Sequence, residues 1–144
     1  EYEKMKKHTV IGWSMLQDLK QYQEEPLVRI AEQICRWHHE RYDGKGYPDG
    51  LKGDEIPISA QVVSLADVYD ALTNERVYKK AIPHEKAIEM IVEGECGQFN
   101  PLLIECLLEI KEDIPIQLMN AEHRNSWTPL GGGNTLVAGL KTEG

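Results

Sequence analysis

The sequence predicts an all-α domain of about five helices, and three observations indicate this class. Apolar residues recur at three- and four-residue steps in five segments, the period of an amphipathic helix. Proline or serine stands where four of these segments begin, as is common in a first helical turn. A loop rich in glycine and proline, residues 40–57, separates the second segment from the third. At 144 residues, the chain is long enough for one domain with a core.

Composition restricts the class of protein further. Hydrophobic residues make up 41% of the chain, as in soluble globular proteins. The formal net charge of -8 argues against a general affinity for nucleic acid polymers. No apolar run approaches the ~18 residues of a membrane span, and no signal peptide opens the chain. The three cysteines predict reduced thiols in a cytosolic, cytoplasmic protein rather than a disulfide or a cysteine metal site.

The first predicted helix covers residues 1–21 and places a histidine among apolar residues. Its repeating face consists of His8, Ile11, Met15, Leu19 and Tyr22. A lone histidine on an apolar face is more often a core residue than a metal ligand. From this helix alone, both interpretations of His8 stay open.

The second predicted helix, residues 26–39, ends in the adjacent pair His38 and His39. Neighbouring helical residues point about 100° apart, so that one ion is hard for both to share. Two ions ~3.5–4 Å apart could each take one histidine. The pair therefore indicates a multinuclear centre, and the alternative is a helix end followed by an ordinary turn-rich loop.

The third predicted helix, residues 59–74 with Ser59 as its N-cap, is apolar nearly all round. This pattern predicts the central buried helix of the domain. Asp67 and Asp70 lie three residues apart on one of its faces, and a buried carboxylate is costly unless it is paired or metal-bound. The alternative is that both carboxylates cap the helix or pair with basic groups.

A basic segment and two further helices follow. Arg76, Lys79 and Lys80 form a basic cluster on this acidic chain, and from these residues alone the segment is expected to be a solvated helix end. The remaining helices are expected over residues 83–95 and 101–111, and His84 and His123 match no motif and are expected at the surface. From about residue 120 the pattern ends, so we predict a helical domain at 1–119 and a flexible tail or linker at 120–144.

Five short motifs resemble the signature of the HD-GYP phosphodiesterases over roughly residues 1–110. They are His8 with Gly12, His38-His39-Glu40 with Asp43-Gly44, Gly46-Tyr47-Pro48, the segment 66–73, and Arg76 with Lys79. The turn before residue 101 also matches, with Asn100 where the family usually has aspartate. The resemblance implies an HD-domain-like helical bundle that hydrolyses cyclic di-GMP to pGpG or GMP with two or three divalent metal ions, iron or manganese.

The resemblance also implies residue roles. The metal ligands would be His8, His38, His39 and Asp67. Asp67 and Asp70 would be catalytic, with Asp70 orienting a histidine or a lysine. The substrate would contact Tyr47, Arg76 and Lys79. Whether Tyr47 stacks on a guanine or bonds a phosphate stays open.

One part of the family pattern has no counterpart, because none of the five histidines is followed by aspartate. The family's His-Asp pair lies upstream of the segment that begins this chain. We therefore expect the C-terminal part of a domain that is incomplete at its N-terminus, an upstream regulatory domain, and uncovered apolar faces that favour a homodimer. Activity of this chain is thus an open question. The alternatives are a non-catalytic cyclic-dinucleotide binding or protein-interaction module, and a phosphohydrolase of another nucleotide such as cyclic GMP-AMP.

Overall fold

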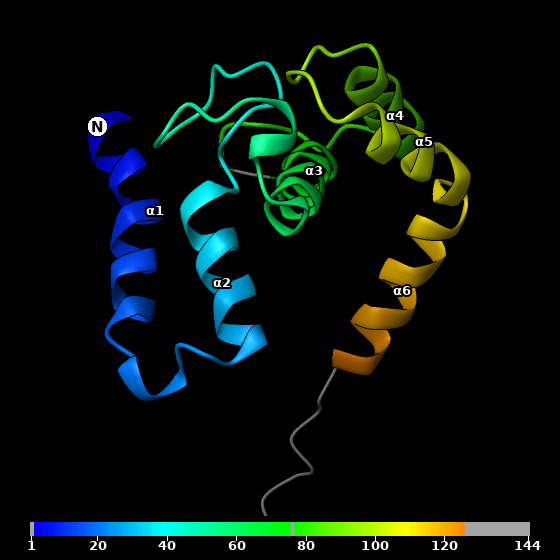
Figure 1. Ribbon diagram of the computed structural model, residues 1–144. Helices are drawn as coiled ribbons and strands as arrows, with labels where there is room; N and C mark the ends of the chain where they lie inside the picture. The colour runs from blue at the N-terminus through cyan, green and yellow to red at the C-terminus, as the bar shows by residue number, and fades with distance from the viewer. Residues whose placement is uncertain (1, 76, 126–144) are drawn as a thin grey trace, which may run out of the picture. The chain divides into compact units, whose positions relative to one another are not determined.

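The structure, a computed structural model, describes residues 2–75 and 77–125 (Figure 1). These residues form six α-helices and two short 3-10 helices, Lys20–Tyr22 and Gly53–Glu55, and no β-strand lies among them. The α-helices are α1 (Tyr2–Gln17), α2 (Pro26–Trp37), α3 (Ile58–Thr73), α4 (His84–Val92), α5 (Pro101–Ile110) and α6 (Asp113–Asn125). The predicted all-α class is confirmed. In the described ranges, none of the helices is both long and apolar enough to cross a membrane.

The chain divides into two compact units, residues 1–111 and 112–144. The second unit contains α6, a helix that the sequence analysis did not predict, and α6 runs across the predicted boundary between residues 119 and 120. That boundary and the role of the tail stay predictions, since residues 126–144 and the side chain of His123 lie outside the described residues.

Helices α1 and α2 lie side by side and run in opposite directions (Figure 1). Thr9 is fully buried, and its hydroxyl donates a hydrogen bond of 2.9 Å to the carbonyl of Lys6. Gly12 lies against Cys35 of α2, where a Cβ would stand 3.6 Å from the Sγ atom. Gly12 therefore marks a helix contact, although an alanine would also fit there.

The predicted inward face of α1 is exposed, so that expectation was wrong. Ile11 is 56% and Met15 67% exposed, and His8 lies on the exposed side as well. The reason is that α1 turns its small residues, Thr9 and Gly12, toward α2 rather than its large apolar ones. The interpretation of His8 as a core residue is therefore excluded.

Helix α3 is buried on one side only, which corrects the prediction of a central buried helix. Its buried residues are Ala60, Gln61, Leu65 and Leu72, whereas Ile58 and Val62 are about half exposed. Helices α2 and α4 pack against α3, and the side they leave open carries Asp67 and Asp70. Ser59 is not the N-cap, which is Pro57; the Ser59 hydroxyl instead donates to the side-chain oxygen of Gln33 on α2.

Helices α4 and α5 supply the rest of the core. The buried side chains are Ala87, Ile88, Ile91, Leu103 and Leu107. Four other residues of the same apolar patterns are exposed, namely Val92, Leu102, Cys106 and Ile110. Asn100 caps α5 by accepting a hydrogen bond of 3.0 Å from the backbone N–H of Leu102, a role that asparagine and aspartate can both fill.

Candidate metal centre

The antiparallel pairing of α1 and α2 brings three histidines together. His8 comes from α1, His38 caps the end of α2, and His39 lies in the following turn. The Nε2 atoms of His8 and His38 are 3.2 Å apart, and one donor nitrogen from each ring lies within 4.8 Å of the other two. The cluster joins residues that are 30 positions apart in the sequence.

The tautomer of the neutral His38 ring is fixed by the backbone of its own helix. Its Nδ1 atom lies 2.7 Å from the carbonyl oxygen of Ile34. Because a carbonyl only accepts, Nδ1 carries the proton of the neutral ring, and the Nε2 lone pair, which faces Nε2 of His8, is the atom that a metal ion would take. A ring N–H held by a backbone carbonyl is the usual support of a metal-binding histidine.

His39 is held in its neutral form. Burial, together with the neighbouring His38 and His8, lowers its pKa from 6.5 to about 4, against the opposing charge of Asp67. Near neutral pH, its ring is therefore unprotonated and can act as a ligand. Three converging imidazoles form a donor set that suits divalent transition metals, so the residues present fit the metal that the family motif implies.

The helix ends earlier than the sequence suggested, and this changes the geometry of the histidine pair. Because α2 stops at Trp37, His38 and His39 do not diverge as two residues inside one helix would. Their ring centroids are 4.2 Å apart. The three histidines could thus serve a single ion, and the expected separation onto two ions does not follow from helix geometry.

The two aspartates of α3 take different places. Asp67 is exposed, and its negative charge acts on His39, so it lies near the cluster. Asp70 accepts a hydrogen bond from the side-chain amide of Asn74 at the end of α3. Among the described residues, the group of converging donors consists of the three histidines and does not include either carboxylate.

Glu40 anchors the loop that follows the histidines, a role that the sequence analysis missed. Its carboxylate is 3% exposed and accepts hydrogen bonds from three consecutive backbone N–H groups. The donors are Asp49 at 2.7 Å, Gly50 at 3.0 Å and Leu51 at 3.0 Å. These bonds compensate the burial of the charge and hold the far end of the loop against the end of α2.

A second attachment of the same loop runs through Asp49. Arg36 donates two hydrogen bonds to this carboxylate, at 2.8 and 2.9 Å, and the indole N–H of Trp37 donates a third at 2.7 Å. The hydrogen bond to Arg36 lowers the pKa of Asp49, and the same bond raises the pKa of Arg36. The loop is therefore fixed to α2 on both sides of the histidine pair.

The Gly-Tyr-Pro triplet completes the wall beside His39. A Cβ on Gly46 would overlap the backbone of Glu40 and Arg41, so only glycine fits there. The N–H of Tyr47 donates to the carbonyl of His39 at 3.2 Å. The Tyr47 ring stacks on the His39 ring with centroids 4.9 Å apart, next to the Lys6 ammonium.

The predicted substrate cations are only partly described. Arg76 lies outside the described residues. Lys79 is exposed, and its Nζ atom donates to the carbonyl of Ala71 at 3.3 Å. The Lys79 charge also acts on the thiol of Cys96. All three cysteines are free thiols in the structure, and Cys106 is exposed.

His84, expected at the surface, is instead largely covered. Its side chain is 18% exposed, and its Nδ1 atom lies 2.8 Å from the Tyr69 hydroxyl. As the first residue of α4, His84 joins that helix to α3, where burial raises the pKa of Tyr69.

A helical hairpin that gathers three imidazoles beside a tightly anchored loop defines a helical domain with a candidate metal centre. The chain belongs to the HD domain family, which matches residues 1–101. The predicted membership of the HD-GYP group is confirmed by relatives that carry its phosphodiesterase names.

Three of these relatives show how far the similarity extends. A "Probable cyclic di-GMP phosphodiesterase" of Vibrio cholerae is 38% identical over 90% of this chain and 30% of its own length. A "Cyclic di-GMP phosphodiesterase" of Thermotoga maritima is 39% identical over 79% of this chain and 30% of its own. A "3'3'-cGAMP-specific phosphodiesterase 2" of Vibrio cholerae is 39% identical over 76% of this chain and 20% of its own. The chain therefore spans less than a third of the length of each relative.

Proposed function

We propose that this chain carries the metal centre of a phosphodiesterase that hydrolyses cyclic di-GMP to pGpG or GMP. One observation carries the proposal. The three histidines converge with the tautomer of His38 fixed by Ile34, and they do so in a chain whose relatives are named cyclic di-GMP phosphodiesterases.

The proposed ligands are His8, His38, His39 and Asp67, holding two or three divalent ions, iron or manganese. The imidazole donors favour transition metals, and the Asp67 carboxylate lies near enough to His39 for its charge to act on that ring. When bound, such ions act as Lewis acids and supply an activated water for hydrolysis of a phosphodiester.

The chain's own side chains would bind and orient the substrate. Tyr47 presents an aromatic ring beside the cluster, suited to stacking on a guanine or to bonding a phosphate. Arg76 and Lys79 are proposed to hold phosphate oxygens. Arg76 would do so with bidentate hydrogen bonds and Lys79 as a point charge. Asp70 is proposed to fix the end of α3, on which Asp67 stands, through its bond to Asn74.

The wider setting is also part of the proposal. Three free thiols are what a chain in the reducing cytoplasm retains. Relatives of which the match covers only 30% of the length support an additional regulatory domain in the complete protein. Exposed apolar side chains on α1 and α2, such as Met15 and Leu27, support a homodimer.

A second substrate is supported by the relatives named as specific for 3'3'-cGAMP. The two substrates differ in one base, so a panel of both cyclic dinucleotides separates them. Turnover of cyclic di-GMP at a higher kcat/KM supports the first proposal, and the opposite order supports the second. Tight binding of either nucleotide that survives chelation, without turnover, would identify a non-catalytic module.

Two variants test the proposed centre. His38→Ala and Asp67→Ala should each abolish hydrolysis, because each removes a proposed ligand. Lys20→Gln serves as the matched control, since it changes one exposed residue in the 3-10 helix between α1 and α2. Unchanged turnover in both ligand variants would refute the assignment.

A further inference from the structure

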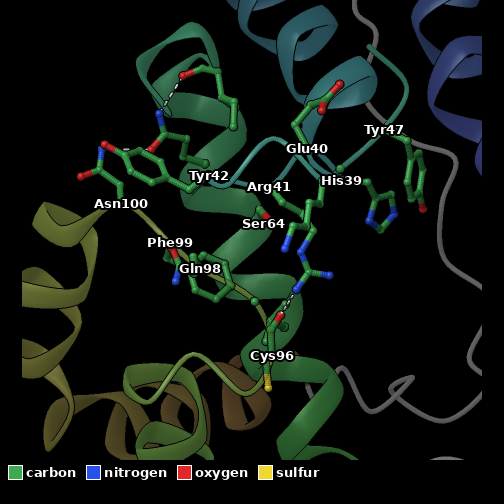
Figure 2. Close-up of a pocket in the computed structure, with 16 residues that line it drawn as sticks. His39, Glu40, Arg41, Tyr42, Tyr47, Ser64, Cys96, Gln98, Phe99 and Asn100 are labelled. Carbon is green, nitrogen blue, oxygen red and sulfur yellow. Dashed lines mark hydrogen bonds between the residues drawn. The ribbon is translucent and has the colours of Figure 1, made fainter. Parts of the chain in front are cut away.

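A cavity of about 130 Å³ adjoins the histidine cluster and shares His39 and Tyr47 with it. The loop after α2 forms one wall, α3 forms another through Ser64 and Val68, and the turn of residues 96–100 closes the third side (Figure 2). Two cations from the loop, Arg41 and Lys45, line this space. The cavity is thus a polar extension of the candidate metal centre.

Arg41 reaches from the loop to the turn on the far side, as Figure 2 shows. Its guanidinium donates a hydrogen bond to the carbonyl oxygen of Cys96. Gly97 makes room for it, because this residue has φ +106° and a Cβ there would overlap the guanidinium. The backbone of the turn is therefore shaped around the arginine.

Most donors of this arginine stay available. A guanidinium carries five N–H groups, and the bond to Cys96 uses one of them. Among the side chains of residues 6–75 and 77–121, no carboxylate lies at salt-bridge distance from Arg41, whereas Arg36 is paired with Asp49 through two hydrogen bonds. On a chain of net charge -8, an arginine without an acidic partner beside a metal centre indicates an anion site.

Positive charge from other segments converges on the same place. The charges of Lys79 and Arg41 both act on the thiol of Cys96, although burial and Glu95 outweigh them and raise its pKa. Lys45 is 82% exposed and lies 3.9 Å from Asp43. Glu40, the acidic residue on the cavity wall, is occupied by three backbone N–H groups. The lining of the cavity therefore carries two cations, Arg41 and Lys45, against one carboxylate, Glu40, whose oxygens are already hydrogen-bonded.

We propose that Arg41, assisted by Lys45, forms an anion subsite that holds a phosphate group in this cavity. A cyclic dinucleotide has two phosphodiesters, so that one can lie at the histidine cluster while the second is held by Arg41. This assignment of the ligand rests on the proposed function, whereas the binding of a phosphate group by Arg41 does not.

The first experiment titrates the metal-free 144-residue chain with inorganic phosphate at pH 8 and constant ionic strength, followed by amide NMR shifts of the 96–100 turn. Arg41→Gln should raise the dissociation constant about tenfold, because charge-assisted bonds to phosphate are lost. Lys45→Gln should raise it about threefold without disturbing the bond to Cys96. Lys20→Gln, which removes an equal charge elsewhere, should leave it unchanged.

Affinities equal to wild type in both Arg41→Gln and Lys45→Gln would overturn the subsite. If Arg41→Gln lowers the thermal midpoint of the chain, the phosphate affinity of Lys45→Gln tests the subsite instead, because that variant keeps the hydrogen bond from Arg41 to Cys96.

The second experiment titrates the same metal-free chains with cyclic di-GMP. If Arg41→Gln raises the dissociation constant for cyclic di-GMP about tenfold, as it does for inorganic phosphate, the second phosphodiester is supported as the ligand. An unchanged dissociation constant for cyclic di-GMP would overturn that assignment in favour of free phosphate. Hydrolysis measured separately distinguishes the two proposals. A chain that binds phosphate through Arg41 but never hydrolyses the nucleotide keeps the subsite and loses the proposed function.

Discussion

The Nε2 atoms of His8 and His38 lie 3.2 Å apart, although 30 residues separate them in the sequence. The antiparallel pairing of α1 and α2 creates this proximity, and the bond from Nδ1 of His38 to Ile34 leaves the Nε2 lone pair without a proton. At this distance one ring nitrogen can donate a hydrogen bond to the other, and a shared cation would replace that bond by taking both lone pairs.

Removing His38 should weaken metal binding. Loss of a residue that only supports a metal ligand lowers metal affinity about 10–100-fold. Because His38 is itself a proposed ligand, His38→Ala should lower the affinity for manganese at least about tenfold. His84→Ala is the matched control, because His84 bonds Tyr69 and lies outside the histidine group. Titration with manganese, followed by metal analysis after dialysis, measures both variants. Equal manganese affinity in His38→Ala and wild type would contradict the proposed ligand set.

The metal-free chain should lose stability as the pH falls from about 6.5 to about 4. The pKa of His39 is about 4 in the folded chain, against 6.5 ordinarily. Between these values the unfolded chain binds the additional proton, and protonation therefore favours unfolding. Urea unfolding at pH 7 and at pH 5 measures the effect, and His39→Gln should show a smaller difference between the two. The same slope in wild type and variant would mean that His39 is not buried in its neutral form.

Glu40→Ala should destabilise the domain by about 2–4 kcal/mol, because three backbone N–H groups lose their acceptor. Glu105→Ala, which shortens an exposed glutamate on α5, should stay within about 0.5 kcal/mol of wild type. Urea unfolding of both variants is the measurement. A small effect of Glu40→Ala would show that the loop is held by Arg36 and Asp49 without it.

Two glycines should respond to alanine in opposite directions. Gly46→Ala places a Cβ inside the backbone of Glu40 and Arg41 and should cost about 2 kcal/mol or more. Gly12→Ala fits against Cys35 and should stabilise α1 by about 0.5–1 kcal/mol, since alanine favours a helix. Thermal unfolding compares the pair directly. Tolerance of alanine at Gly46 would contradict the close loop packing.

The helices could be predicted because their signals are local. The apolar period and the cap at Asn100 depend on neighbouring residues, and the first five helices were found within a few residues of their ends. Which side of a helix is buried depends on the elements packed against it. The exposed side of α3 and the inward position of Thr9 therefore could not be predicted from the sequence pattern.

The candidate site was predicted unevenly for similar reasons. The meeting of His8, His38 and His39 followed from the family resemblance rather than from spacing. The role of Glu40 was missed because its partners are backbone N–H groups, which have no sequence signature. The available signal was that Glu40 directly follows the histidine pair. A carboxylate that is buried at such a place needs hydrogen-bond donors to compensate its charge.

The most direct test of the central claim is hydrolysis of cyclic di-GMP by this chain, supplied with manganese or ferrous iron and analysed by chromatography. We predict linear pGpG or GMP in the presence of metal, and none after addition of a chelator. A folded, helical, metal-loaded sample that releases no product would contradict the proposal that this chain carries a working phosphodiesterase centre.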